Sequence, residues 1–221
     1  MKILPQVLTT LFFLLVANAC TQDAYDKGEG AYSLMQADLC LAYTNSEGMV
    51  DHFVTDGGET HRLKTPMNGG WMSTPDSVYR AALYYTKASD GSGTTINRMG
   101  RVGVMTPKFI DDMKTDPLGF ESAWISKSGV FLNLGLNVKT GSTTDEDAIQ
   151  TLGCHIDSLM AYPDSTHAVR LLLYHDQGKV PQYYTQRAFF SISIKNLLAD
   201  TIYLVINTYD GLIERAFEVE R

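Results

Sequence analysis

Basic residues are scarce in this 221-residue sequence. Lys and Arg number 18 against 25 Asp and Glu, which gives a net charge of −7 at pH 7. Proteins that bind nucleic acid ordinarily concentrate Lys and Arg on one face, and electrostatic docking on anionic lipid also needs a basic cluster. No such stripe occurs in this sequence, so we expect no nucleic-acid partner and no electrostatic binding to a lipid surface.

Sequence motifs of catalysis are also missing. There is no His-Glu-x-x-His, no Gly-x-Ser-x-Gly, no Ser-x-x-Lys and no glycine-rich phosphate loop that leads into a helix. His155 and His175 would approach each other, near Cys154, only if their strands are neighbours, and a zinc site needs three converging ligands. We therefore predict no enzyme, no cofactor and no metal. The alternative is an exported hydrolase or glycan-processing accessory protein whose site is assembled from scattered residues.

Cysteine occurs only three times, as Cys20, Cys40 and Cys154. The last two have no local partner. In an oxidising compartment they could pair with each other, but we interpret them as two small apolar residues in or near a core.

Long apolar runs are absent except near the start, where one run extends from Val7 to Ala17, broken only by two threonines. This run is too short to cross a bilayer, which takes roughly 20 residues, and small residues follow it, as in a signal peptide. Its ending, Ala17-Asn18-Ala19-Cys20, resembles a bacterial lipobox. We predict a signal peptide at 1–19 and a lipid anchor on Cys20. Residues 20–30 would form a tether, and the protein would be an exported outer-membrane lipoprotein, with surface exposure as an option.

Period-two alternation dominates the next stretch. On 32–43, Met35, Ala37, Leu39, Leu41 and Tyr43 share one face, which we predict to be the buried face of a strand. Turn clusters separate this strand-like run from four more. Five strands in 31–106 without a long helix favour a small closed barrel, because closure removes exposed edges.

A helix start follows the barrel, because Thr106 is a good N-cap and Pro107 suits the first turn. We predict a short linker helix within 107–119. Residues 120–221 then hold six or seven short strand-like runs separated by turns, which is typical of a β-sandwich. The predicted fold class is thus all-β, a barrel and a sandwich joined by one helix.

The order of these segments resembles a known family. Four segments carry the resemblance: Tyr32-Ser-Leu-Met-Gln-Ala-Asp38, Val54-Thr-Asp-Gly-Gly-Glu-Thr-His-Arg-Leu63, Gly129-Val-Phe-Leu-Asn-Leu-Gly-Leu-Asn137 and Val169-Arg-Leu-Leu-Leu-Tyr-His-Asp176. Together they are similar to the NigD-like lipoproteins of the Bacteroides and Prevotella group, and the loop 65–76 departs most from that pattern. The resemblance implies an OB-like N-terminal barrel, a C-terminal β-sandwich and no catalytic residues.

Exposed aromatic residues are the remaining candidates for a binding site. Trp71, Tyr183 and Tyr184 lie beside proline and glycine, and aromatic rings with polar neighbours can stack on sugars or peptides. The alternative is that Trp71 closes one end of the barrel. We predict a non-catalytic, lipid-anchored binding, assembly or immunity module whose partner is another envelope protein or a glycan.

Overall fold

The computed structural model describes residues 34–220, and from Gln36 onward they form one compact unit. The predicted signal peptide, Cys20 and the tether at 20–30 all lie outside the described residues. Thirteen strands and no helix occur within the described range. Accordingly, the described residues contain no helix that is long and apolar enough to cross a membrane.

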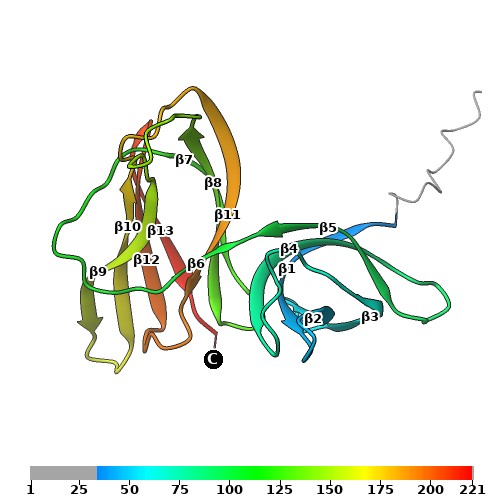
Figure 1. Cartoon of the computed structure of the whole chain (residues 1–221). Helices are drawn as coiled ribbons and strands as arrows, with labels where there is room; N and C mark the ends of the chain where they lie inside the picture. The colour runs from blue at the N-terminus through cyan, green and yellow to red at the C-terminus, as the bar shows by residue number, and fades with distance from the viewer. Residues whose placement is uncertain (1–33, 221) are drawn as a thin grey trace, which may run out of the picture. The chain divides into compact units, whose positions relative to one another are not determined.

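The first five strands close into a barrel in the order β1-β2-β3-β5-β4 (Figure 1), which confirms the predicted closed barrel. The strands are β1 (Gln36–Thr44), β2 (Val50–Thr55), β3 (Thr60–Met67), β4 (Val78–Lys87) and β5 (Thr94–Arg101). Met72, which has no exposed surface, packs with Val50 and Phe53 in the barrel core.

The predicted buried face of β1 is wrong. Cys40 and Ala42, which we had placed on the other face, are completely buried inside the barrel. The large side chains of the interior come from neighbouring strands, as Phe53 and Tyr85. A five-stranded barrel has a narrow interior, so β1 contributes small residues inside and directs its larger apolar residues outward.

The remaining strands form two four-stranded sheets, in the orders β13-β12-β10-β9 and β6-β11-β8-β7. Their bounds are β6 (Gly103–Met105), β7 (Gly119–Ile125), β8 (Phe131–Thr140), β9 (Thr151–Ala161), β10 (His167–Asp176), β11 (Tyr184–Ser193), β12 (Thr201–Thr208) and β13 (Gly211–Glu218). The two sheets share one core, to which β8 contributes Leu132, Leu134 and Leu136 with no exposed surface. The predicted β-sandwich is therefore confirmed.

The predicted linker helix is wrong, because residues 106–118 run without helical structure. The backbone of this segment pairs with strands of the sandwich instead. Lys108 exchanges hydrogen bonds with β9, where its N–H donates to the carbonyl of Cys154 at 3.1 Å and its own carbonyl accepts from Ile156 at 3.0 Å. Further along, the carbonyl of Lys114 accepts from the N–H of His175 at 2.9 Å. Long-range backbone pairing thus overrides the local helix signal.

The crossing from barrel to sandwich also comes earlier than the predicted helix. β5 is the last barrel strand and ends at Arg101, whereas β6 already pairs in parallel with β11. The close approach at this crossing requires glycine at position 103, where a Cβ atom would lie 2.7 Å from the ring of Phe190.

Candidate functional site

A buried ion pair lies where the barrel meets the sandwich. The Arg80 guanidinium, on β4, donates to both oxygens of Asp56, with Nη1 to Oδ1 at 2.6 Å and Nη2 to Oδ2 at 2.7 Å. The Arg80 side chain is 2% exposed and that of Asp56 16%. A charge this deeply buried is tolerated only when it is paired and hydrogen-bonded, so the two side chains depend on each other.

Two sandwich residues complete this polar network. Asn133 on β8 donates from Nδ2 to Asp56 Oδ2 at 2.8 Å, and its Oδ1 accepts from Arg80 Nη2 at 3.0 Å. Ser191 on β11 accepts from Arg80 Nε at 3.0 Å and donates to Asn133 Oδ1 at 2.8 Å. The guanidinium also lies 4.2 Å from the centre of the Phe131 ring, a cation–π contact. These contacts hold the barrel against the outer face of β8 and β11.

The turn after β2 places Asp56. Its N–H donates to the carbonyl of Leu39 on β1 at 3.0 Å. Gly58, with a φ of 86°, closes the turn in a conformation that favours glycine, and its N–H donates to the carbonyl of Thr55 at 2.9 Å. The cluster Asp56-Gly-Gly-Glu59, predicted as a hairpin turn, therefore also positions a carboxylate.

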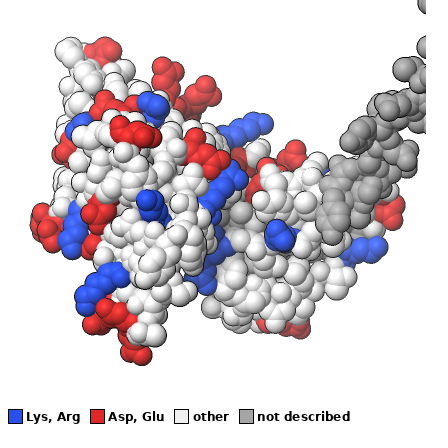
Figure 2. Space-filling view, turned by 90° about the horizontal axis from the view of Figure 1, so that it is seen from above, with Lys and Arg blue, Asp and Glu red and all other residues white. Residues whose placement is uncertain are grey.

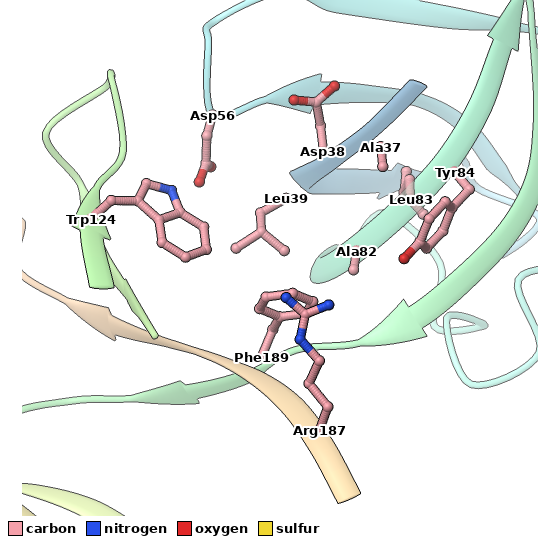
Figure 3. A pocket seen from close by; sticks show the side chains of 10 residues that line it. All are labelled: Ala37, Asp38, Leu39, Asp56, Ala82, Leu83, Tyr84, Trp124, Arg187 and Phe189. Carbon is pink, nitrogen blue, oxygen red and sulfur yellow. The ribbon is translucent and has the colours of Figure 1, made fainter. Parts of the chain in front are cut away.

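A cleft of about 340 Å³ opens beside this network (Figure 3). Outward-facing residues of the barrel form one side, since Ala37 and Leu39 on β1 lie opposite Tyr84 and Ala82 on β4 in the strand register. The sandwich supplies the other side, with Trp124 from β7 and with Arg187 and Phe189 from β11. In the view of Figure 3, the Trp124 ring, the Phe189 ring and the Tyr84 hydroxyl all point toward the same space.

The sandwich wall of the cleft is preorganised. The rings of Trp124 and Phe189 meet edge to face with centroids 6.4 Å apart. The Arg187 guanidinium lies 4.8 Å from the Phe189 ring centre and donates to both oxygens of Glu121, at 2.7 and 2.6 Å. Gly135 faces Phe189 across the β8–β11 pair, and a Cβ there would lie 2.7 Å from a serine hydroxyl of β7. Each side chain of this wall is thus held by a neighbour.

Asp38 borders the cleft, but its carboxylate turns away from Trp124 and Phe189 in Figure 3. Its Oδ2 accepts a hydrogen bond from the Tyr85 hydroxyl at 2.8 Å, and burial raises the pKa of Tyr85. A second, open pocket at this end of the barrel is lined by Asp38, Tyr85, Glu59 and Lys87. The Asp38 carboxylate therefore belongs to the barrel mouth.

None of the three predicted ligand residues lines the cleft. Trp71 is half-buried, edge to face with Tyr79 at 5.7 Å and 4.9 Å from the Arg101 guanidinium. Tyr183 and Tyr184 are 78% and 54% exposed at the start of β11. A ligand-binding role for Trp71, Tyr183 and Tyr184 therefore stays a prediction.

The sequence reasoning missed the cleft residues Trp124, Arg187 and Phe189. A usable signal was present, because β8 alternates Asn133 and Gly135 with three leucines. That alternation marks the outer face of this sheet as polar and small at the point where the barrel packs.

The structure does not bring His155 and His175 together, since they pair with Leu172 and Leu152 respectively in the β9–β10 register. Within residues 34–220 no cluster of three or more His, Cys, Asp or Glu side chains could hold a metal ion. Cys40 and Cys154 are free thiols in separate cores. Burial raises the pKa of both, for Cys154 to about 12.

Comparison with solved structures identifies the fold. The chain is similar to a NigD-like immunity protein from Bacteroides caccae, with 21% identity, a TM-score of 0.63 and coverage of 84% of this chain and 97% of that one. A DUF1344 protein of unknown function from Bacteroides vulgatus has 13% identity and a TM-score of 0.61, over 84% and 92% of the two chains. A candidate lipoprotein from Bacteroides fragilis has 14% identity and a TM-score of 0.61, over 85% and 98%.

No protein-family model matches this sequence, and no curated protein matches it either. At these identities the likeness concerns the fold alone. The resemblance to the NigD-like lipoproteins is confirmed at that level: the chain has the barrel-and-sandwich fold of a NigD-like immunity protein.

Proposed function

We propose that this protein is a non-catalytic, lipid-anchored component of the cell envelope that binds another envelope component in the cleft between barrel and sandwich. The observation that carries the proposal is the cleft itself, which is apolar, aromatic and held in shape by neighbouring contacts. Such concave sites with a few polar groups are where proteins most often bind small ligands or single side chains.

The pairing of charges around the cleft supports a binding role over a catalytic one. Asp56 is bound by Arg80 and Asn133, and Glu121 is bound by Arg187 through two hydrogen bonds. A general base needs a carboxylate with an oxygen free to take a proton from a substrate. Carboxylates bound to a guanidinium in this way instead fix the shape of a site.

Photo-crosslinking in the envelope tests the cleft as the binding site. A photoreactive phenylalanine at position 84, in the cleft wall, should give a specific adduct that disappears when Trp124→Leu is added. The same group at position 183, another tyrosine position outside the cleft, serves as the matched control. An adduct from position 183 alone, or equal adducts from both positions, would refute the cleft as the binding site.

The anchor is the second part of the proposal. The motivation is the apolar run that ends in Ala17-Asn18-Ala19-Cys20, together with the likeness in fold to a candidate lipoprotein. Replacing Cys20 with alanine should move the protein from the membrane fraction to the soluble fraction. If the variant stays with the membrane, the lipobox interpretation fails.

An immunity role is a second candidate, favoured by the fold shared with a NigD-like immunity protein. Deleting the gene should then sensitise the cells to a toxin made by a neighbouring strain, and the intact gene should restore resistance. Unchanged sensitivity across such strains would exclude this role and leave the cleft proposal to its own test.

A further inference from the structure

The cleft offers flat apolar surfaces on opposite sides of a small volume. Trp124 and Phe189 provide aromatic surface from the sandwich, and Tyr84 provides it from the barrel, above a floor that includes Leu39. The face of an aromatic ring carries negative partial charge, so it attracts weakly positive C–H groups. A ligand that fits must therefore present an apolar C–H face.

Three hydrogen-bond donors border the same space without a protein partner in the described residues. They are the indole N–H of Trp124, the Tyr84 hydroxyl and Nη1 of Arg187, since the bonds of Arg187 to Glu121 use only Nε and Nη2. Donors of this kind need acceptors on a ligand. A purely aliphatic or phenyl side chain would leave them unpaired, which costs affinity.

Two of the three charged side chains that line the cleft are paired with an opposite charge, which favours a neutral ligand. Arg187 is matched by Glu121 and Asp56 by Arg80, while the carboxylate of Asp38 is directed to the barrel mouth. Neither an anion nor a cation would find an uncompensated partner charge in the space between Trp124 and Tyr84. Figure 2 shows acidic and basic side chains over this face of the molecule, with several Lys and Arg gathered along the hollow near the middle of the view.

We propose that the cleft binds one neutral pyranose ring of a glycan, which rests its C–H face against Trp124 or Phe189. Its ring and hydroxyl oxygens accept hydrogen bonds from Trp124 and Arg187. This inference rests on the proposed function, because it names the ligand class of the same cleft. A sugar ring meets all three requirements at once: an apolar face, several acceptors and no charge.

The test uses Trp124 as its own reporter. In a Trp71→Phe background Trp124 is the single tryptophan, and its fluorescence is followed while methyl glucoside, methyl galactoside, methyl mannoside or N-acetylglucosamine is added. At least one should shift the signal saturably, with a dissociation constant on the order of 1 mM, ordinary for so small a ligand. Sorbitol, an acyclic polyol without a flat face, should give no saturable shift.

Two variants link the signal to the cleft. Arg187→Lys keeps the charge and can still pair with Glu121, but its ammonium cannot also place an N–H where Nη1 lies, so binding should weaken roughly fivefold. Tyr162→Ser, which alters another exposed tyrosine outside the cleft, should leave binding unchanged.

Three other results of the fluorescence titration would overturn the inference that the cleft binds a sugar ring. Equal shifts with sorbitol would show a solvent effect, and the absence of a shift with every pyranose would exclude a sugar ring. A saturable shift with acetyl-phenylalanine amide alone would assign the cleft to a peptide partner. That last result would leave the proposed binding role intact, and the crosslinking at position 84 judges that role separately.

Discussion

Replacing Asp56 with alanine removes the counter-charge of a guanidinium that is almost completely buried. Arg80 would keep its bonds to Asn133 and Ser191 and its contact with Phe131, but its positive charge would remain in the interface without a carboxylate. Breaking a buried pair from one side costs about 3–5 kcal/mol. Because Asp56 is 16% exposed, water can reach part of the gap, and we expect about 3 kcal/mol.

Removing the other partner should cost less. Arg80→Met takes away the buried charge and leaves a carboxylate that is partly exposed and still accepts a bond from Asn133. We expect about 1–2 kcal/mol for this change, and nearly the same value for the double variant Asp56→Ala with Arg80→Met. The resulting coupling energy is about 3 kcal/mol.

Urea unfolding followed by tryptophan fluorescence measures these values, on the chain expressed from position 21. With a slope of about 1–3 kcal/mol per molar, a loss of 3 kcal/mol moves the midpoint by at least about 1 M. The exposed pair Arg187–Glu121 is the matched control, because it is also joined by two hydrogen bonds but its side chains are 54% and 37% exposed. Glu121→Ala should cost less than about 1 kcal/mol. Additive effects of Asp56 and Arg80 would refute the reasoning.

Three further predictions follow from single buried groups. Met72→Ala should destabilise the chain by about 2–5 kcal/mol, since the side chain is fully buried, whereas Trp71→Ala should cost less in the same thermal melt because Trp71 is half-buried. Burial lowers the pKa of His61, so its charged form is disfavoured in the folded state. Stability should therefore fall as the pH drops below about 6.5, and His61→Phe should flatten that dependence. Cys40 and Cys154 should resist a thiol reagent at pH 8 until urea unfolds the chain, because burial raises both pKa values. Rapid labelling of the native protein would contradict that.

The strands were predictable because alternation and turn residues are local signals. The alternation of 130–139 placed Leu132, Leu134 and Leu136 together, and all three lie in the sandwich core. The linker helix failed for the opposite reason. Thr106 and Pro107 are good helix-start residues, but the backbone after them gains hydrogen bonds with β9 and β10 that a local pattern does not contain.

The cleft could not be predicted from any one segment. Its walls come from β1, β4, β7 and β11, so Leu39 and Phe189 meet only because the barrel packs against the sheet. The buried network has the same property, since Asp56 and Asn133 are 77 residues apart along the chain. Spacing rules act within a strand or a turn, and therefore they leave such contacts open.

The wrong prediction of the buried face of β1 also concerns a strand that lines the cleft. The alternation of Ala37, Leu39, Leu41 and Tyr43 indicated a buried face, yet the barrel core takes Cys40 and Ala42 instead. Both faces of β1 therefore carry apolar residues, as expected of a strand covered on both sides. Leu39 is 9% exposed and Ala37 is open, and both border the cleft. The outer face of β1 is thus only partly covered within the described chain, and the proposed ligand would cover the remaining part.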